Sequence, residues 1–499
     1  MNHPLVACVI IAAAYALLLS LFWVGFLASD DAFYAFLAEK WRAGGAYLPT
    51  SHWGFRYPVI LPVVAANVLF GAGATALGAV AVLYGSGLLL AIYVLIHRFF
   101  SPSKALAVTF LAMTTPIVII SASILNADIP EAFFGLISIG LFVQATQAAR
   151  PAGYLVASGA MCAIACLTRE TSSGLMLAYL MLFLAGAFFE RKVYLWGALG
   201  FLVIFGIEAI YYMALGEGPL YRFMTIAQTH GTVKLTLEDM GGGSGNISTN
   251  RIIGPPLALL FNQEFALLYI LSLPASWSLI RNQALDGAPR VLVRVLVTVM
   301  ATWVLWISYS GAVPPAPRYY SLATVAAILL VALWLTHMAN RKAAVVLGFL
   351  FILGNFAALS LENMHPRFAA RTLADYLQTA QEPVYTDSRT YKRAMTLLRW
   401  SPGEARVWLR QGVPPAGALY FRNVDAVGTI LDSDHDPSGQ AFFRPAFDNP
   451  QTIVSRWTPP KRIIGHILTG LHLDQYLPAR LHGKIVYCAS PVDVVRIAR

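Results

Sequence analysis

Long apolar runs recur along the first three-quarters of the chain, and charged or Gly- and Pro-containing segments separate them. Each run is long enough to cross the ~30 Å hydrocarbon core of a bilayer as a helix. We therefore predict a mostly α, polytopic membrane protein with about eleven transmembrane helices. The predicted spans are residues 5–27, 74–96, 104–121, 131–149, 153–168, 172–189, 193–215, 256–279, 290–309, 319–338 and 343–360.

The pattern changes after residue 361. Short apolar runs, such as EPVYTDS, GALYFRN and KIVYCAS, are now separated by Pro, Gly and charged residues. This alternation is typical of a small soluble α/β fold. We divide the chain into a transmembrane domain, residues 1–364, and an extracytoplasmic α/β domain, residues 365–499.

The outer loop after the first span, residues 28–73, has a pattern of its own. Apolar residues recur at helical spacing from Phe33 to Trp41, with charged residues between them. This predicts an amphipathic helix that lies on the membrane surface. A second such helix is expected from Pro58 to Phe70, and the turn between the two carries His52, Trp53 and Arg56.

The composition agrees with this pattern, since 58% of the 499 residues are hydrophobic and only 12% are charged. Such a chain lies outside the range of soluble globular proteins. Its formal net charge of +10 would suggest nucleic acid as a partner if the basic residues shared one soluble face. They lie in the turns between spans instead, so we expect no nucleic-acid partner.

The basic turns also predict the orientation, because short loops rich in Lys and Arg stay in the cytoplasm. This rule places the N-terminus inside and residues 28–73, 122–130, 216–255, 310–318 and everything after about 361 outside. We expect a multi-pass protein of the plasma (inner) membrane whose active site and C-terminal domain face the periplasm or exterior. The predicted cytoplasmic turns carry Arg98, Lys104, Arg150, Arg191, Lys192, Arg281, Arg290, Arg294, Arg341 and Lys342.

Two adjacent carboxylates, Asp30 and Asp31, open the first outer loop in the stretch SDDAFY. Helix capping explains one of them, because carboxylates favour a helix N-terminus. A second like charge at the mouth of a span is costly, and ionisable groups at membrane depth are usually functional. We predict that at least one of the pair is catalytic.

A second acidic pair, Asp128 and Glu131, lies in the next outer loop, within SILNADIPEAFF. Capping is again the simple alternative, and Pro130 near the first helical position supports it. Together with the first pair, however, these residues suggest carboxylates that converge on one outer cavity, with Asp128 as a further catalytic candidate. The loops could also hold a divalent cation through Asp128 and Glu131, although no ligand spacing requires a metal.

Several stretches together carry a resemblance to a known family. They are DDAFY, HWGFRYPVILP, NADIPEAFF, RET at residues 169–171 and PRYY at residues 317–320. In this order along the chain they resemble the polytopic GT-C glycosyltransferases. The similar branch is the bacterial one that includes protein mannosyltransferases and the lipid A aminoarabinose and galacturonic acid transferases. The resemblance covers the membrane part, about 360 residues.

The resemblance implies that an Asp opening the first outer loop is the catalytic carboxylate. That residue maps to Asp30 or Asp31, with Asp30 at the first position of the usual Asp-Glu pair. This chain has Asp at the second position as well, so both candidates stay open. Several relatives also carry a lysine-proline-proline stretch, where this chain reads FRYP and offers Arg56 in place of the lysine.

The chemistry of such proteins accounts for these residue types. A sugar leaves a polyprenyl phosphate, so an acceptor hydroxyl must lose a proton while negative charge grows on the departing phosphate. We predict an inverting transfer with Asp30 or Asp31 as base, and a glycan, a lipid or a protein as acceptor. The expected phosphate ligands are Arg56, Arg169, Arg318, Tyr319, Tyr320 and His52.

Each phosphate ligand has a simpler interpretation. Arg56 could extend toward the headgroups of the surrounding membrane lipids, Arg169 could pair with Glu170, and His52 could be a structural histidine. Arg318 is the stronger candidate because it precedes two tyrosines where an outer loop re-enters the membrane. The glycines of GGGSG, within residues 216–254, indicate either a flexible linker or a mobile flap over the donor.

Two other classes of function compete with the enzyme. A transporter or flippase of lipid-linked sugars would also bury charges among its spans. Such proteins usually contain paired halves with interrupted spans, and we find no convincing repeat in the sequence. A non-catalytic membrane scaffold would not need matched carboxylates on two outer loops.

Overall fold

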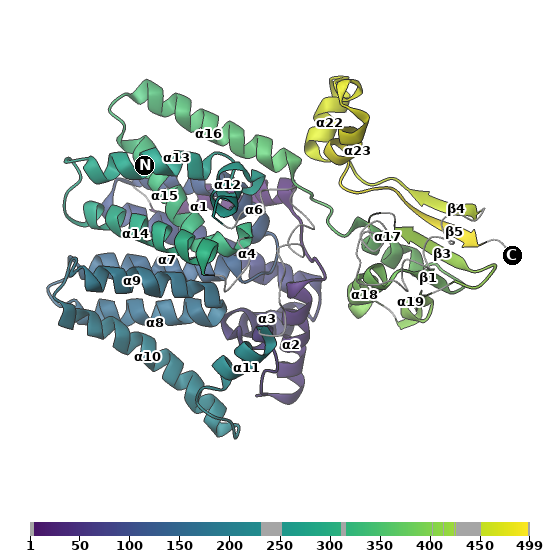
Figure 1. Ribbon diagram of the computed structural model, residues 1–499, viewed down its shortest axis with the longest axis horizontal. Coiled ribbons are helices and arrows are strands. Elements are labelled where there is room, and N and C mark those ends of the chain that lie inside the picture. The colour runs from purple at the N-terminus through teal and green to yellow at the C-terminus, as the bar shows by residue number, and fades with distance from the viewer. Residues whose placement is uncertain are drawn as a thin grey trace. The chain divides into compact units, whose positions relative to one another are not determined.

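The computed structural model describes residues 4–230, 252–310, 316–401, 403–412, 414–423, 425 and 451–497 (Figure 1). The chain divides into two compact units, which we describe separately. Unit 1 comprises Met1–Phe26 and Phe33–Leu359, and unit 2 comprises Leu27–Ala32 and Ser360–Arg499. The glycine-rich stretch GGGSG, interpreted above as a linker or a flap, lies outside the described residues.

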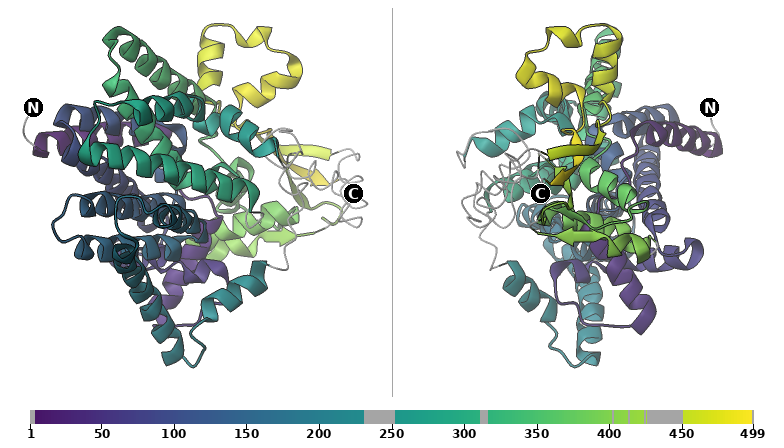
Figure 2. Two further views of the ribbon diagram at one scale, coloured as in Figure 1. Left: turned by 60° about the vertical axis from the view of Figure 1, so that its left-hand side comes forward. Right: turned by 90° about the vertical axis from the view of Figure 1, so that its right-hand side faces the viewer.

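Unit 1 is built from helices packed side by side (Figures 1 and 2). Because backbone groups in hydrocarbon must bond within their own segment, apolar runs of this length form helices. The helices are α1 (Pro4–Phe22), α2 (Asp30–Gly44, which begins in unit 2), α3 (Tyr57–Phe70), α4 (Ala74–Phe99), α5 (Pro102–Thr114), α6 (Pro116–Ala122), α7 (Asp128–Ala145), α8 (Ala152–Thr168), α9 (Ser173–Leu184), α10 (Arg191–Ala214), α11 (Tyr221–His230), α12 (Gly254–Phe261), α13 (Leu268–Arg281), α14 (Gly287–Tyr309), α15 (Ser321–His337) and α16 (Arg341–Leu361, which ends in unit 2). Short 3₁₀ turns are η1 (His52–Phe55), η2 (Glu170–Ser172), η3 (Gln263–Phe265) and η4 (Pro317–Tyr320).

Among the described residues, six helices are long and apolar enough to cross a membrane, or seven if α5 and α6 form one broken span. The mostly helical, membrane-spanning architecture is therefore confirmed, whereas the count of eleven spans stays a prediction. The predicted span 104–121 bends by 75° between α5 and α6. The bend falls at Pro116, whose missing N–H and bulky ring interrupt a helix. The predicted span 256–279 is likewise divided, because Asn262 ends α12 and η3 follows.

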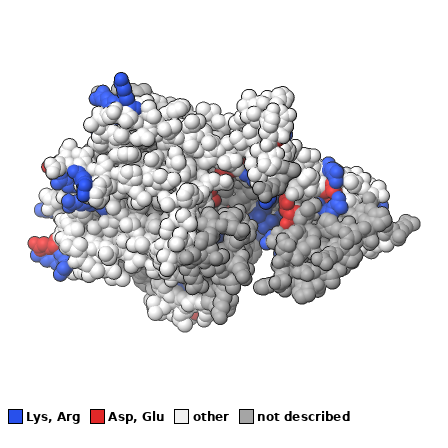
Figure 3. Space-filling view, turned by 45° about the horizontal axis from the view of Figure 1, so that its top comes forward, with Lys and Arg blue, Asp and Glu red and all other residues white. Residues whose placement is uncertain are grey.

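The basic turns gather at one end of unit 1. Arg98, near the end of α4, donates to Gln144 at the end of α7 (3.1 Å), and Lys104 contacts His337 at the end of α15 (2.9 Å). Figure 3 shows Lys and Arg side chains grouped at this margin of the unit. This arrangement agrees with basic turns that share one side of a membrane, and the orientation itself stays a prediction.

The loop between the first two predicted spans does form two helices, α2 and α3, joined by η1. In unit 1 the ring of Phe33 on α2 stacks on Trp53 of η1, with 4.3 Å between centroids. Pro58 near the start of α3 supplies a backbone angle suited to a first helical turn. Their position on the membrane surface stays a prediction.

Unit 2 contains a five-stranded sheet in the order β2-β1-β3-β5-β4. Its strands are β1 (Val384–Thr386), β2 (Leu409–Gln411), β3 (Leu419–Asn423), β4 (Gln451–Trp457) and β5 (Val492–Ile497). β1 pairs in parallel with β2 and β3, whereas β5 pairs antiparallel with β3 and β4. Its helices are α17 (Phe368–Leu377), α18 (Ser388–Leu397), α19 (Gly403–Val407), α22 (Ile463–Gly470) and α23 (Ala479–Val486), with 3₁₀ turns η5 (Leu398–Trp400) and η6 (Asp474–Tyr476).

The short apolar runs of unit 2 form different kinds of secondary structure. EPVYTDS contains β1 and GALYFRN contains β3, as alternating apolar runs favour. KIVYCAS does not become a strand. It closes α23, and its Tyr487 forms an isolated bridge with Lys461. The neighbouring strand is β5, whose Val492, Val494 and Val495 are buried in the core.

Candidate active site

The RET sequence lies at the junction of α8 and η2 and contacts three groups of residues in unit 1. Arg169 ends α8 in an extended conformation, which directs the next residues into the 3₁₀ turn η2 rather than onward as helix. Arg169 and Glu170 of this junction meet different partners, whereas Thr171 and Ser172 share one, Glu131. We call residues 169–172 the RET junction.

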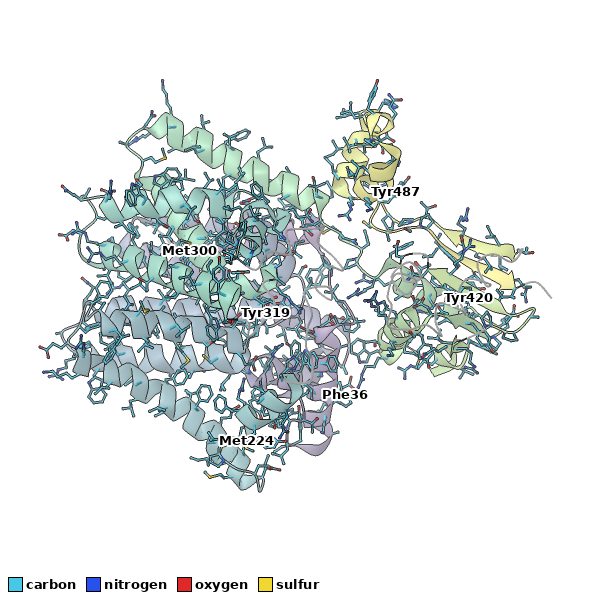
Figure 4. The ribbon with its side chains drawn as sticks, viewed as in Figure 1. Phe36, Met224, Met300, Tyr319, Tyr420 and Tyr487 are labelled. Carbon is cyan, nitrogen blue, oxygen red and sulfur yellow. The ribbon has the colours of Figure 1, made fainter. Side chains whose placement is uncertain are left out.

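Arg169 connects the RET junction to two predicted outer loops. Its guanidinium forms an ion pair with Asp128, at the start of α7, and both side chains are buried. It also donates to the backbone oxygen of Arg318 (3.3 Å) and lies over the ring of Tyr319, 4.3 Å from the centroid. Tyr319 is labelled in Figure 4. The predicted residues Asp128, Arg169 and Arg318 therefore meet.

Glu131 is fully buried one turn after Asp128 on α7. Its carboxylate accepts hydrogen bonds from Thr171, from Ser172 (2.9 Å) and from Ser321 at the start of α15 (2.6 Å). Buried carboxylates are costly unless they accept such bonds. Glu131 thus connects the RET junction to α7 and α15, which is a structural task.

A divalent cation at Asp128 and Glu131 would have to displace their present partners, and the metal site stays a prediction. Asp128 is paired with an arginine, and three hydroxyl groups donate to the carboxylate of Glu131. A cation needs oxygen lone pairs that are not already directed at donors. Among the described residues, no group of three or more His, Cys, Asp or Glu side chains comes together in a way that could hold a metal. No step below uses one.

Arg56 meets the RET junction at Glu170. It is buried between η1 and α3, donates to the hydroxyl of Tyr34 (2.6 Å) and lies 3.9 Å from a carboxylate oxygen of Glu170. Tyr34 belongs to α2 and is itself fully buried. Arg56 therefore joins the first outer loop to the RET junction.

Arg222 is a central residue that the sequence reasoning missed. It lies in α11, is 2% exposed, and donates to Glu170 (3.2 Å), to Glu208 of α10 (2.9 Å) and to the backbone oxygen of Phe55 (3.1 Å). Glu208 also accepts from the hydroxyl of Tyr212 (2.7 Å). The sequence does not single out Arg222, because this residue lies within residues 216–255, which the pattern of spans predicts to be an outer connection.

One signal would have led to this group. Glu208 is a single carboxylate inside the apolar run GFLVIFGIEAIYY, and an intramembrane carboxylate calls for a cationic partner. The sequence gives a weaker signal for Tyr34, the partner of Arg56, since this residue follows the acidic pair within DDAFY.

Three arginines from separate segments act on one another electrostatically. Burial lowers the pKa of Arg169 to about 10, and the positive charges of Arg56 and Arg318 contribute to this lowering. Arg318 is exposed and lies over the ring of Tyr319, 5.2 Å from the centroid. Mutual repulsion of this kind favours an anion near the three guanidinium groups.

The remaining phosphate candidates are placed differently. The ring of His52 lies against Trp53, 3.7 Å between centroids, which suits a packing role as well as a binding one. The hydroxyl of Tyr320 lies 3.0 Å from that of Ser308, and the residue is buried. Tyr320 therefore packs within unit 1, whereas Tyr319 carries the contacts with both arginines.

Asp30 and Asp31, in unit 2, have different surroundings despite being neighbours. Asp31 is 1% exposed, and its carboxylate accepts from the backbone N–H groups of Leu27, Ser29 (2.7 Å) and Ala32 (2.9 Å). Burial raises the pKa of Asp31 to about 6. Asp30 is only partly buried. Asp31 therefore holds the turn that leads into α2.

Comparisons with known proteins add an independent finding. A family model described as dolichyl-phosphate-mannose-protein mannosyltransferase matches residues 62–211. No curated protein matches the sequence. The structure is similar to that of ArnT from Cupriavidus metallidurans in the apo state, at 15% identity and a TM-score of 0.57, covering 90% of this chain and 95% of that one.

Two further solved structures have a similar arrangement. One is ArnT from Cupriavidus metallidurans bound to undecaprenyl phosphate, at 16% identity and a TM-score of 0.53, covering 90% of this chain and 96% of that one. The other is the Archaeoglobus fulgidus oligosaccharyltransferase in complex with Zn and sulfate, at 12% identity and a TM-score of 0.54, covering 98% and 88%. The chain has the GT-C fold. The predicted GT-C resemblance is thereby confirmed, and the GT-C fold together with the apolar helices identifies a multi-pass membrane protein.

Proposed function

We propose that the protein is a membrane glycosyltransferase that moves a sugar from a polyprenyl-phosphate-linked donor to an acceptor hydroxyl on the extracytoplasmic side. The GT-C fold supports this class of reaction, and a similar protein of that fold has been seen with undecaprenyl phosphate. The observation that carries the proposal is that Arg169 donates to the backbone oxygen of Arg318 (3.3 Å), while the adjacent Glu170 lies 3.9 Å from Arg56, so that three arginines from separate segments come together. Guanidinium groups bind phosphate through paired, charge-assisted hydrogen bonds.

The arginines act on the leaving group. As the bond from the sugar C1 to the phosphate oxygen breaks, negative charge accumulates on the polyprenyl phosphate. Arg318 is exposed and can contact that phosphate directly, whereas the ion pair with Asp128 fixes the guanidinium of Arg169 over the ring of Tyr319. Tyr319 keeps both guanidinium groups over its ring.

Asp30 is the proposed general base. The acceptor hydroxyl gives its proton to Asp30 while its oxygen bonds to C1 from the side opposite the phosphate, so the anomeric configuration inverts. Asp31 is less suited to this task because three backbone N–H groups already occupy its carboxylate. Asp30 is the first residue of α2, the helix that also carries Tyr34, the partner of Arg56.

A flippase or transporter would leave the donor intact. The reaction proposed above instead releases free polyprenyl phosphate and forms a new glycoside. Purified protein incubated with a lipid extract of its native membranes distinguishes the two by mass spectrometry. Formation of both products supports the enzyme, whereas donor that stays intact in the presence of acceptor contradicts it.

The donor site is tested by Arg318→Ala. Loss of a charge-assisted contact should weaken undecaprenyl phosphate binding by roughly 10- to 100-fold. Arg191→Ala is the matched control, because Arg191 is exposed at the basic end of unit 1 and donates to the backbone of Leu184. Equal binding by both variants and the wild type would remove the phosphate assignment.

A further inference from the structure

Two helices of unit 2 each carry a pair of arginines at helical spacing. Arg367 is the N-cap residue of α17 and Arg371 follows one turn later. Arg389 and Arg393 have the same spacing in α18. Residues four apart share one face of a helix, and α17 packs against α18. None of these four arginines belongs to the donor site proposed above.

The charges of these arginines act across the two helices. Burial lowers the pKa of Arg393 to about 10, with further lowering by Arg367 and Arg389. Burial and the charge of Arg389 also lower the pKa of Arg367. Arg371 is half-buried, and its burial lowers its pKa. Arg367, Arg389 and Arg393 therefore repel one another across the two helices, and Arg371 lies one turn along α17 from Arg367.

Carboxylates near the cluster do not cancel it. Asp31 and Asp375 act on Arg371, and Asp387 acts on Arg393. Asp31 accepts three backbone N–H groups, and Asp387 caps α18 by accepting from the N–H of Thr390 (2.8 Å). Asp31 and Asp387 are engaged elsewhere, and the pKa values of Arg367, Arg371 and Arg393 remain below their usual range despite these acids. Burial lowers the pKa of the nearby His365, and the charge of Arg371 lowers it further.

Arg367 has a second unusual feature. Its backbone adopts φ = 67°, in the left-handed region that a residue with a side chain seldom enters. Its buried Nε has no hydrogen-bond acceptor among the described residues. Strained residues of this kind tend to occur where a ligand is held.

We propose that Arg367, Arg371, Arg389 and Arg393 form a binding site for a phosphate group, carried by a lipid headgroup or free in solution. Four guanidinium groups on two packed helices can surround a tetrahedral anion with paired hydrogen bonds, and the anion relieves their repulsion. The site goes beyond the proposed transfer reaction and does not depend on it. It predicts that unit 2 recognises a phosphate-bearing molecule.

The test uses the full-length protein in neutral detergent and two probes measured by calorimetry. One probe is inorganic phosphate, and the other is phosphatidic acid in mixed micelles, with phosphatidylcholine micelles as the uncharged reference. For at least one of the two probes, the Kd of the double variant Arg389→Gln with Arg393→Gln should be about ten-fold or more above that of the wild type. Arg389→Gln alone, at an exposed position that does not threaten folding, should show a smaller loss in the same direction.

The control is Arg496→Gln in the same unit, because Arg496 is already paired with Glu382 (2.6 Å). Weaker binding of both probes by the double variant identifies the phosphate group itself as the ligand, and weaker binding of phosphatidic acid alone identifies a lipid headgroup. Unchanged binding of both probes by the double and single variants overturns the site, as does an equal loss in Arg496→Gln. Arg318→Ala is measured in parallel, so that failure of the donor site and failure of this site appear in different variants.

Discussion

At the scale of single residues, the neighbours Asp30 and Asp31 have different roles in this account. Asp31 holds a turn, and Asp30 is the proposed base. Asp31 is buried and accepts three backbone N–H groups, whereas Asp30 is partly accessible. Sequence alone gives the two residues the same chemistry and the same distance from the first span. Their burial distinguishes them, because it depends on how the chain folds back from Leu27 to Ala32.

The pKa of Asp31 gives a prediction with a definite sign. Burial raises this pKa from 3.8 to about 6, so the folded protein binds the proton more tightly than the unfolded chain. Stability contributed by the protonated carboxyl is therefore lost as the pH rises from about 4 to about 6, by at most about 3 kcal/mol. Asp31→Asn lacks this titration.

The measurement is the thermal midpoint of wild type and Asp31→Asn across that pH range. The wild type should lose stability relative to the variant as the pH rises through the window, and the difference should level off above it. A difference between the two proteins that stays constant from pH 4 to pH 7 would contradict the assignment.

Much of the site was accessible from the sequence for one physical reason. Ionisable residues are costly at membrane depth, so Asp128, Glu131, Arg169 and Arg318 stand out against the apolar runs. Their partners were not accessible in the same way. The hydroxyl donors of Glu131 look like ordinary Ser and Thr, and only the folded chain brings Ser321 to it.

At the scale of elements, α8 and α10 approach closely through glycine. A Cβ added at Gly200 of α10 would overlap the backbone oxygen of Val156 on α8, and one added at Gly159 would overlap that of Gly197. Small residues let helix backbones meet in this way. This contact positions α8, which leads to Arg169, against α10, which carries Glu208.

Gly200→Ala should therefore destabilise the protein by about 1–3 kcal/mol and reduce sugar transfer. Gly206→Ala on the same helix is the matched control. A Cβ added at Gly206 would have no atom of a neighbouring element within 4 Å. The control should be neutral or slightly stabilising. Thermal midpoints and transfer rates are compared, and equal behaviour of the two variants would show that the close approach is unimportant.

The ion pair between Arg222 and Glu208 connects α11 to α10. Arg222→Met should cost about 3–5 kcal/mol, because it leaves the carboxylate of Glu208 buried without its cation. Adding Glu208→Gln to Arg222→Met removes the stranded charge and should recover part of the stability. A double variant less stable than Arg222→Met, as judged by thermal midpoint, would refute this explanation.

Helix boundaries show where sequence patterns fail. Long uninterrupted runs gave α4, α10, α14 and α16 close to their predicted limits. The run at 104–121 reads as one span, yet Pro116 breaks it. An apolar run reports only that a segment avoids water, whereas a local backbone constraint decides whether the helix is continuous.

At the scale of the whole molecule, the main prediction is the orientation in the membrane. Single cysteines at Ser51→Cys and Ser388→Cys, in a variant lacking the native cysteines, should react with an impermeant reagent in intact cells. Ser101 lies at the basic end of unit 1, where its hydroxyl accepts from the backbone N–H of Lys104. A cysteine in the Ser101→Cys variant should react only after the membrane is breached. The reverse pattern would place the proposed chemistry on the cytoplasmic side and contradict the account.

The sequence predicted the membrane class and the fold resemblance, because composition and the order of several short stretches survive at low identity. The count of spans and the arrangement of unit 2 were less accessible. The strand β5 was not singled out in the sequence, and KIVYCAS instead closes a helix. Short apolar runs fit strands and helix ends equally well until their neighbours in space are known.

The central claim is that Asp30 removes the proton from the acceptor during sugar transfer, and the Asn variants of the acidic pair test it most directly. Both variants are purified in detergent, checked for intact folding, and assayed for transfer from a polyprenyl-phosphate donor. Asp30→Asn keeps the size of the side chain but cannot take the proton, so turnover should fall by roughly 10²–10⁴-fold while the donor still binds. Asp31→Asn should lose less turnover and more stability. Near-normal transfer by Asp30→Asn would contradict the account and move the catalytic role to Asp31 or Asp128.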